Sequence, residues 1–456
     1  MSFFGWKKNK LKFLGITLFR IKIVKNIFVL YVVGIPILKI SNRSNVIANK
    51  FAINKSFNTK VFDEEIASLV NNIKLKQSPQ KNKSGKIAFI ATEICDMGGH
   101  TKCIKDLINS LFGIYKQKLF LTQKWRSRDI APLNYSLIST KISVKGINAS
   151  IFDFTKGVKS FTQDIINFSP TAIFVLIHPH DVFATAVISL IKKTTNIKII
   201  YFNHASHYPV LGMSFADIIL EGIPTTEKIT NEKRGFKNTK IIGLQSLAKD
   251  ETIYYTKTQL DNLKKTMGIS SDSLITMSGA SSYKFFDNED SSYFELIKNL
   301  LEEEAKLVHI MISEFNDKQK SIIKKIFEGS EALHRLIIIP YQTDFDKYFQ
   351  CADVFIDSFP VSSALTQIDL MRNKVASVVK INKENPEFSF HEYQMTNYPY
   401  MFEDVKDMKS AILELLHNKE KREEIIAKNY DFWLHNYEAN IFKQKLINLI
   451  DEDQHE

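Results

Sequence analysis

Short runs of β-branched and aliphatic residues alternate along the chain with amphipathic segments of helical length. Strands that read as continuous apolar runs, with helices between them, are typical of parallel sheets covered on both faces. Six runs form a first series of predicted strands: Ile87–Ala91, Lys118–Leu121, Ala172–Ile177, Lys198–Phe202, Asp217–Leu220 and Lys240–Gly243. Five form a second series: Leu274–Ser278, Val308–Ile312, Arg335–Ile339, Val354–Ile356 and Ala376–Val379. The two series predict two doubly wound α/β domains in tandem.

The domain limits follow from the breaks between these series. We expect an N-terminal domain over residues 86–245 and a C-terminal domain over residues 246–430. Lys419–Ile450 has a long helical pattern with few breaks, so residues 431–456 are predicted to form a C-terminal helix. Residues 71–85 are polar and have the composition of a linker. Residues 1–70 remain as an N-terminal extension.

The positive charge of the chain belongs to this extension. The formal net charge is +11 over 456 residues, but residues 1–86 hold 17 Lys and Arg against three acids (Asp63, Glu64 and Glu65). The first fifty residues also repeat a pattern, an apolar run through a Gly-Ile step that ends in a cation, at Phe13–Arg20 and Val32–Lys39. No uncharged run there is long enough to cross a bilayer as a helix. We expect residues 1–50 to contact an anionic membrane surface or to form two strands packed on the body.

Composition describes a folded chain, with 44% hydrophobic and 24% charged residues. The three cysteines are odd in number, and no secretory signal with a cleavage site precedes the fold. A reducing cytoplasm is therefore the expected location. The extension lacks aromatic residues interleaved on a basic face, so we expect no nucleic-acid partner.

Ligands of doubly wound sheets bind where the strands end at their carboxyl edges. In the first domain, the first strand runs into a loop with Gly98, Gly99 and His100, followed by a helical pattern. Glycines at such a turn let backbone N–H groups approach an anion, although a plain turn has the same appearance. The spacing differs from the Gly-x-Gly-x-x-Gly of nicotinamide enzymes and argues against a dehydrogenase.

Histidines follow the next two strands of this domain. His178 begins His178-Pro-His-Asp181, and His204 and His207 belong to Asn203-His-Ala-Ser-His207. An imidazole with a pKa near neutrality suits the removal of a proton from an acceptor hydroxyl. His207 and His204 are therefore the candidate catalytic bases, although each is equally explained as a hydrogen-bonded structural histidine. No third ligand of clear geometry stands out, so no metal site is predicted.

The second domain carries the strongest signal. Its first strand ends in Ser278-Gly-Ala-Ser-Ser-Tyr-Lys-Phe285, in which Ser281 and Lys284 are candidates for contact with a diphosphate. After Asp357, a helix is predicted to begin near Ser362 and Ser363, with Thr366 and Asp369 one turn apart. Hydroxyls beside free N–H groups suit a phosphate, and Asp369 suits a ribose. Without Lys284 the same residues fit a helix cap and a surface carboxylate.

At these residues the chain resembles GT-B glycosyltransferases, in particular the donor domain of O-GlcNAc transferase-like and bacterial surface-polysaccharide enzymes. Ile356-Asp-Ser, Thr366 and Asp369 are similar to the family's Leu-Asp-Thr…Thr-Thr-Gly-Met-Asp, and Ser281-Ser-Tyr-Lys-Phe285 is similar to its Gln-Leu-Tyr-Lys-Ile. The resemblance implies two Rossmann-like domains, with Lys284 and Thr366 on the donor diphosphate and Asp369 on the ribose. Asn203-His-Ala-Ser-His207…Leu211-Gly212 is similar to an element of some bacterial members.

Two stretches depart from this pattern. Ser363-Ala-Leu-Thr366 replaces the family's Gly-His-Thr-Thr, and Asn373-Lys-Val375 replaces its Gly-x-Pro. These two changes leave open which nucleotide base and which sugar the donor carries. The resemblance implies an inverting, metal-independent hexosyltransferase with no cofactor, which moves a sugar from a nucleotide diphosphate sugar, expected to be UDP-linked. A saccharide or lipid-linked glycan would be the acceptor, in lipopolysaccharide or capsule synthesis at the inner face of the cytoplasmic membrane. The alternatives are a nucleotide-sugar epimerase of the same fold and a non-catalytic scaffold.

Overall fold

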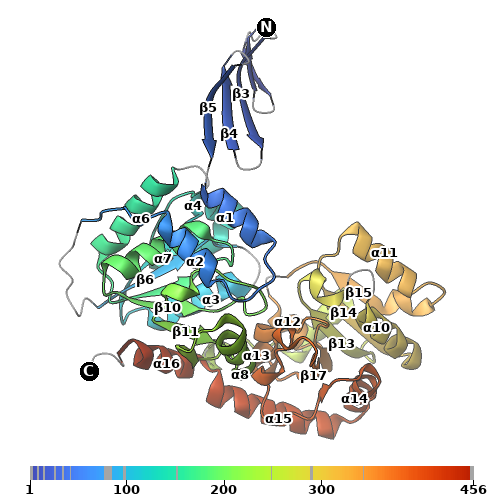
Figure 1. Cartoon of the computed structure of the whole chain (residues 1–456). Helices are drawn as coiled ribbons and strands as arrows, with labels where there is room; N and C mark the ends of the chain where they lie inside the picture. The colour runs from blue at the N-terminus through green and yellow to red at the C-terminus, as the bar shows by residue number, and fades with distance from the viewer. Residues whose placement is uncertain are drawn as a thin grey trace. The chain divides into compact units, whose positions relative to one another are not determined.

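The structure is a computed structural model, and it divides into two compact units (Figure 1). One unit comprises residues 1–104, 112–220 and 231–239, and the other comprises residues 105–111, 221–230 and 240–456. Before Ser44 the backbone alone is described. The described residues are 4–7, 10–13, 16–24, 27–32, 35–41, 43–76, 85–95, 99–149, 153–247, 249–287, 291–342 and 344–451.

The N-terminal segment forms an antiparallel sheet of its own. Its strands follow one another in the order β1 (Phe4–Lys7), β2 (Lys10–Phe13), β3 (Ile16–Val24), β4 (Ile27–Val32) and β5 (Ile35–Ser41). The two copies of the Gly-Ile pattern occupy equivalent places, since one joins β2 to β3 and the other joins β4 to β5. Their glycines, Gly15 and Gly34, lie outside the described residues. The segment is thus a five-stranded meander, whereas the sequence had suggested two strands as one alternative.

Two helices follow this sheet and pack within the first unit. Helices α1 (Arg43–Ala52) and α2 (Lys60–Ser68) contact each other and α7 (Val182–Thr194), as Figure 1 shows. The side chains of Ile47, Phe51, Ile66 and Val70 are buried in the same apolar cluster as those of α7. Residues 43–70 therefore belong to the core of the first domain, although the sequence had grouped them with the extension. Of the predicted linker, residues 77–84 lie outside the described part.

The first α/β sheet has seven strands in the order β12-β11-β10-β9-β6-β7-β8. Each pair of neighbours from β11 through β10, β9, β6 and β7 to β8 is parallel, as the continuous apolar runs predicted. The bounds are β6 Lys86–Ala91, β7 Lys116–Leu121, β8 Ser143–Gly146, β9 Ala172–Leu176, β10 Lys198–Phe202, β11 Ile218–Glu221 and β12 Thr239–Ile241. All six predicted strands are present, and only β8 is additional. Burial of β6 and β9 on both faces confirms their central position.

Helices connect these strands. They are α3 (Gly99–Leu111), α4 (Lys124–Ile130), α5 (Pro132–Lys141), α6 (Phe154–Phe168), α7 and α8 (Pro224–Ile229), with short turns at Met213–Phe215 and Thr230–Arg234. Asp153 and Asp181 cap α6 and α7 by accepting hydrogen bonds from Lys156 N and Ala184 N. Carboxylates suit these positions because the first N–H groups of a helix have no partner within it.

The second α/β sheet has six parallel strands in the order β15-β14-β13-β16-β17-β18. The bounds are β13 Leu274–Gly279, β14 Leu307–Ile312, β15 Leu336–Ile339, β16 Val354–Ile356, β17 Ala376–Lys380 and β18 Met401–Phe402. The five predicted strands are confirmed, and the two-residue β18 is additional. Apolar clusters pack around this sheet, one of them centred on Phe285, Phe294 and Met311.

The helices of the second unit complete the fold. They are α9 (Lys257–Thr266), α10 (Ser292–Glu303), α11 (Asp317–Ile326), α12 (Asp346–Phe349), α13 (Ala364–Arg372), α14 (Val405–His417), α15 (Lys419–Asn436) and α16 (Ala439–Asp451). Short 3-10 turns lie at Lys249–Glu251, Ser282–Phe285, Glu331–Arg335, Pro386–Phe388 and His391–Tyr393. The predicted C-terminal helical segment is confirmed, with a break at Tyr437 and Glu438 that divides it into α15 and α16. Within the described residues, no helix combines the length and the apolar character needed to cross a membrane.

Both parallel sheets reverse their strand order once. In the first sheet the chain proceeds outward from β6 to β8, then returns to the other side of β6 with β9. In the second it proceeds from β13 to β15, then returns beside β13 with β16. At such a reversal neighbouring connections leave in opposite directions and open a crevice at the carboxyl ends of the two strands. The residues after β6, β9, β13 and β16 therefore lie at the two crevices where a ligand is expected.

Candidate functional site

Histidines from three strand ends meet at the reversal of the first sheet. His100 lies in the first turn of α3, after β6, and its Nε2 is 2.8 Å from the carbonyl oxygen of Leu176, the last residue of β9. Its ring stacks on that of His204, which follows β10, with 4.4 Å between the ring centroids. His178, after β9, lies edge-on to His100 at 6.3 Å. The structure thus brings together His100, His178 and His204, which the sequence placed at three separate strand ends.

Burial keeps the stacked pair neutral. It lowers the pKa of His100 to about 4, and it lowers that of His204 well below its usual value, an effect that the neighbouring His100 reinforces. The Nδ1 atom of His204 is buried and has no hydrogen-bond partner among the described residues. The side chain of His178, in contrast, is exposed. A neutral imidazole pair beside an exposed imidazole can accept hydrogen bonds from hydroxyl groups but attracts anions weakly.

His207 lies on the connection that also carries His204, which we call the histidine loop (residues 203–214). Its ring is half-buried and packs against the exposed ring of Tyr208, with 4.2 Å between the centroids. Of the predicted glycines, Gly99 is the exposed first residue of α3, and Gly98 lies outside the described residues.

The histidine loop is held by residues that the sequence had not marked. The carboxylate of Asp63, on α2, accepts hydrogen bonds from Gly212 N at 2.8 Å and from the hydroxyl of Ser214 at 2.6 Å. Gly212 has a φ of +91°, a conformation that favours glycine. The hydroxyl of Thr59 donates to the Val210 carbonyl at 2.7 Å. The N-terminal helices thus fix the far end of the loop.

Arg234 supports the middle of the loop. Its buried guanidinium donates through Nη2 to the carbonyl oxygen of Ser206 at 2.6 Å and lies 4.8 Å from the centroid of the Phe57 ring. The only sequence signal for these residues was that Asp63 belongs to a short acidic cluster within a strongly basic segment. Nothing in the sequence alone marked Arg234.

The reversal of the second sheet is built around Asp357 and Lys284. The ammonium of Lys284, in the turn after β13, donates to the carbonyl oxygen of Ser362 at 2.8 Å. Asp357, directly after β16, is fully buried and accepts hydrogen bonds from the hydroxyls of Ser362, at 2.5 Å, and Ser363. The hydroxyl of Ser278 donates to the Ile356 carbonyl at 2.6 Å and joins the ends of β13 and β16.

This arrangement gives the two serines a different part from the one that the sequence suggested. Both hydroxyls donate to Asp357 and are buried, so they hold the loop before α13 in place. The first-turn N–H groups of α13, from Ala364 to Thr366, are the ones that a helix leaves without internal partners. Thr366 is half-buried and Ser281 is exposed. Lys284, the first-turn N–H groups of α13 and the hydroxyls of Ser281 and Thr366 are therefore the groups at this site that can donate to an anion.

Burial shifts both ionisable groups at this site. It lowers the pKa of Lys284 to about 8, although the nearby Asp357 carboxylate opposes the shift. It raises the pKa of Asp357, against the effect of the hydrogen bonds from Ser362 and Ser363 and of the Lys284 charge. Each group thus stabilises the charged form of the other, and Lys284 remains largely protonated near neutral pH.

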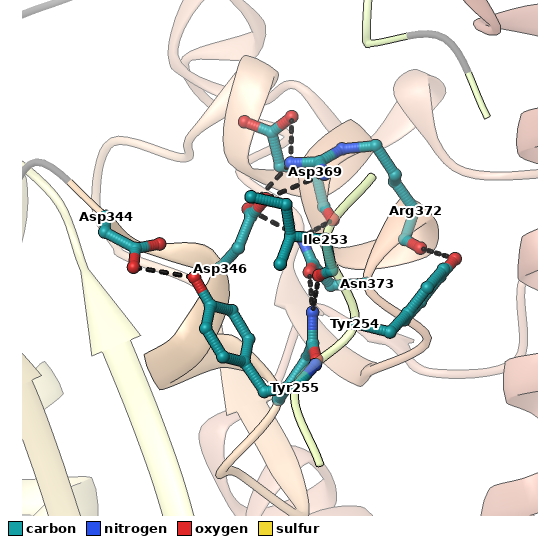
Figure 2. A network of polar contacts seen from close by, with 9 residues as sticks. Ile253, Tyr254, Tyr255, Asp344, Asp346, Asp369, Arg372 and Asn373 are labelled. Atoms are coloured by element: carbon teal, nitrogen blue, oxygen red, sulfur yellow. Dashed lines mark hydrogen bonds and ion pairs between the residues drawn. The ribbon is translucent and has the colours of Figure 1, made fainter. Parts of the chain in front are cut away.

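Asp369 lies on α13 one turn after Thr366, beside a network that fixes the end of the helix (Figure 2). Arg372 forms a bidentate ion pair with Asp346, at 2.7 and 2.8 Å, and lies 3.5 Å from Asp369. The side-chain amide of Asn373 donates to Asp346 at 2.9 Å, and Gln350 donates to Asn373 at 2.7 Å. Because Arg372 is closest to Asp346, the half-buried carboxylate of Asp369 keeps capacity to accept further hydrogen bonds.

The network explains one departure from the family pattern. Asn373 replaces the glycine of the family's Gly-x-Pro and uses its side chain to join α13 to α12, while Tyr254 donates to the Arg372 carbonyl at 3.1 Å (Figure 2). The following residue, Lys374, has a φ of +58°. Among the residues that the structure describes, no group of three or more His, Cys, Asp or Glu side chains is arranged to hold a metal ion.

Two doubly wound sheets in one chain, one of seven strands and one of six, each with one reversal of strand order, form the GT-B fold. The fold is similar to that of Anabaena Alr3699/HepE, solved with UDP and glucose, with a TM-score of 0.62 at 10% identity over 80% of this chain and 99% of that one. It is also similar to the lipopolysaccharide outer core galactosyltransferase WaaB, with a TM-score of 0.57 at 14% identity over 81% of this chain and 99% of that one.

A third similar structure is a variant of Thermobaculum terrenum O-GlcNAc transferase, with a TM-score of 0.56 at 9% identity over 89% of this chain and 76% of that one. The resemblance drawn from the motifs is therefore confirmed at the level of the fold. No protein-family model and no curated protein sequence matches the chain.

Proposed function

We propose that the chain is a glycosyltransferase that transfers a sugar from a UDP-linked donor to a saccharide acceptor. The observation that carries this proposal is the site at the reversal of the second sheet, where the Lys284 ammonium is hydrogen-bonded to the loop that opens α13. A cation beside a helix N-terminus suits a diphosphate. The similar fold of HepE, solved with UDP and glucose, supports the same reading.

In this proposal Lys284 and the N–H groups of Ala364–Thr366 stabilise the charge that builds on the departing diphosphate. Stabilisation of developing charge by fixed donors lowers the barrier most when the donors need no rearrangement. Asp357 provides that rigidity by holding Ser362 and Ser363. The Thr366 hydroxyl and Ser281 contact phosphate, and Asp369 accepts the ribose hydroxyls. Lys284 and these N–H groups supply the positive charge that the departing diphosphate needs, so the reaction needs neither a metal ion nor a cofactor.

The acceptor is bound at the histidine cluster of the first sheet in this proposal, with Gly99, His100 and His178 lining its place. A general base becomes positively charged when it takes a proton, and burial of His204 opposes that charge. The lowered pKa of His204 leaves His207 as the stronger of the two candidate bases. A base that activates the acceptor directly gives inversion at the anomeric carbon.

We further propose a saccharide acceptor, free or lipid-linked, in the synthesis of lipopolysaccharide or capsule. The basic N-terminal segment supports a place at the inner face of the cytoplasmic membrane, where anionic lipids attract Lys and Arg. Similarity of fold to WaaB supports the lipopolysaccharide assignment.

The proposal is tested by incubating the protein with UDP-sugars, with and without candidate glycan acceptors, and measuring UDP release in the presence of a chelator. We expect acceptor-dependent UDP release that His207→Ala lowers by about 10²–10⁴-fold, the range for a general base. Tyr208→Phe, next to it, is the matched control. Isomerisation of a UDP-sugar without an acceptor identifies an epimerase, and absence of any turnover and binding supports a scaffold.

A further inference from the structure

Helices α4 and α5 carry a group of exposed apolar side chains in the first unit. Trp125 is 50% exposed and Ile130 44% on α4, while Leu133 is 65% exposed and Leu137 47% on α5. Leu133 and Leu137 are four residues apart, so they lie on the same face of α5. The inward positions are filled by other residues, since Ser127, Ala131 and Ile138 are buried. The exposed side chains are thus not part of the core of the unit.

Cations accompany these apolar side chains. Residues 124–141 contain Lys124, Arg126, Arg128 and Lys141 against the single acid Asp129. Arg126 is exposed although it forms an ion pair with Glu93 at 2.8 Å, and Arg128 is also exposed. Tryptophan, leucine and isoleucine flanked by Lys and Arg are typical of helices that lie in the plane of a membrane surface.

The two helices are also attached to the loop that leads to the histidine cluster. The Ser127 hydroxyl accepts a hydrogen bond from Ile94 N at 2.9 Å, and the Asn134 amide donates to the Cys95 carbonyl at 3.2 Å. Cys95 N in turn donates to the hydroxyl of Thr101, the residue after His100 in α3, at 2.8 Å. A surface that contacts α4 and α5 therefore lies beside the proposed acceptor site.

We propose that the outward face of α4 and α5 is a membrane-contact surface that lies on an anionic lipid bilayer and receives a lipid-linked acceptor from it. This inference rests on the proposed function, and it adds a second contact that is separate from residues 1–50. Four side chains of this size expose a few hundred Å² at most, whereas a stable protein interface needs about 800 Å² from each partner. Insertion into a bilayer requires no complementary surface, so a membrane fits this face better than a protein.

The test is sedimentation of the full-length protein with vesicles of phosphatidylcholine alone and of an equal mixture of phosphatidylcholine and phosphatidylglycerol. We expect wild-type protein to bind the mixed vesicles, and Leu133→Ser/Leu137→Ser to bind them about tenfold more weakly. The variant has lost two apolar side chains that binding would transfer from water into the bilayer. Both proteins have the same N-terminus, so any contact made by residues 1–50 contributes equally to each.

The matched control is Phe112→Ser/Ile114→Ser. These side chains are 52% and 44% exposed. They precede β7, whereas α4 follows it, so the two groups lie at opposite ends of this strand. We expect this variant to bind as wild type does. As a second measurement, we expect brominated phospholipids to quench the fluorescence of Trp125 in the bound wild type. The Trp125→Phe variant should therefore show less quenching. Trp6 and Trp433 are common to both proteins.

Three results would overturn the inference. The first is that the wild type fails to bind anionic vesicles. The second is that the Leu133→Ser/Leu137→Ser variant binds them as well as the wild type does. The third is that this variant converts an oligomer into a monomer, which would reveal a contact between chains. UDP binding by the same variants, measured by calorimetry, separates this inference from the proposed function. Absence of UDP binding in the wild type removes the proposed function, while the vesicle experiment still decides the membrane contact.

Discussion

Lys284 is the residue on which the proposed donor site depends most. Its ammonium donates to the Ser362 carbonyl, and the Asp357 carboxylate nearby favours its charged form. Burial works in the other direction and lowers its pKa to about 8. The charge that would bind a diphosphate is therefore present at neutral pH but is lost in mildly alkaline solution.

We predict that the affinity for UDP falls about tenfold as the pH rises from about 7 to about 9, because Lys284 loses its proton over this range. Its contribution to folding has the opposite sign. The native state releases this proton near pH 8 and the unfolded state near pH 10.5, so stability from this group rises between these values. Calorimetric titration with UDP at several pH values measures the first effect.

Lys284→Arg provides the comparison, because a guanidinium stays charged throughout this range. We expect weaker binding than in the wild type, since the planar guanidinium does not reproduce the contact with Ser362, but no dependence on pH. A wild-type affinity that stays constant over the same range would show that the Lys284 ammonium does not bind the nucleotide.

At the residue scale the sequence predicted which residues lie together better than it predicted their contacts. Lys284, Ser362 and Ser363 do meet at one sheet reversal. Their spacing in the sequence cannot show that Asp357 uses both serine hydroxyls, since that depends on the turn between β16 and α13. The stacking of His100 on His204 was equally hidden, because it joins residues about a hundred positions apart.

At the scale of elements, α2 is the helix that holds the histidine loop in place. Asp63 accepts two backbone N–H groups and one hydroxyl from Gly212 and Ser214. Burial raises its pKa to about 6 although these bonds oppose the shift. The native state therefore holds this proton more tightly than the unfolded state, and stability from Asp63 falls as the pH rises from about 4 to about 6 and is constant above.

We predict that Asp63→Ala lowers the free energy of unfolding by about 2–4 kcal/mol, because it leaves buried donors without an acceptor. Faster hydrogen exchange over residues 203–214 would accompany the loss, since the loop is no longer held. Asp63→Asn keeps one acceptor oxygen, so it costs less and removes the dependence of stability on pH between about 4 and 6. Chemical denaturation and hydrogen exchange measure these effects.

Asp153→Ala is the matched control for this helix. Asp153 caps α6 in the same unit by accepting from Lys156 N at 2.9 Å, and it has no part in the histidine loop. We expect a loss of about 1 kcal/mol, typical of a helix cap, with unchanged exchange over residues 203–214. Equal exchange in Asp63→Ala and wild type would contradict the role given to α2.

The elements that sequence reasoning recovered are those with continuous apolar runs. The apolar pattern does not predict β8, because its residues, Ser143–Gly146, alternate between exposed and half-buried and carry no apolar run. β18 has two residues, too few for any periodicity. The helices α1 and α2 were grouped with the basic extension because charge dominated the segment, although Ile47, Phe51, Ile66 and Val70 are buried. Apolar spacing was the better guide there than net charge.

At the scale of the whole molecule, the N-terminal region consists of two parts that differ in how they pack. Strands β1–β5 pair only with one another, whereas α1 and α2 pack into the first unit. We predict that deletion of residues 1–42 leaves the melting temperature and UDP affinity unchanged and weakens binding to anionic vesicles. Deletion of residues 1–76 should unfold the first unit, because it removes buried side chains worth about 1.5–3 kcal/mol each.

Thermal unfolding and vesicle sedimentation of the two truncated proteins check this division. A lower melting temperature after deletion of residues 1–42 would show that the five-stranded sheet contributes to the body of the protein. A soluble, fully folded protein after deletion of residues 1–76 would contradict the placement of α1 and α2 in the core.

The proposed transfer of a sugar requires a nucleotide site at the reversal of the second sheet. Calorimetric titration of the wild type and of Lys284→Ala with UDP tests it most directly, with Lys380→Ala, a lysine at the end of β17, as the control. We predict that the wild type binds UDP, that Lys284→Ala binds it about 10–100-fold more weakly, as expected for a charge-assisted contact, and that Lys380→Ala binds as the wild type does. Equal affinity of the wild type and Lys284→Ala, or no binding of UDP by the wild type, would contradict it.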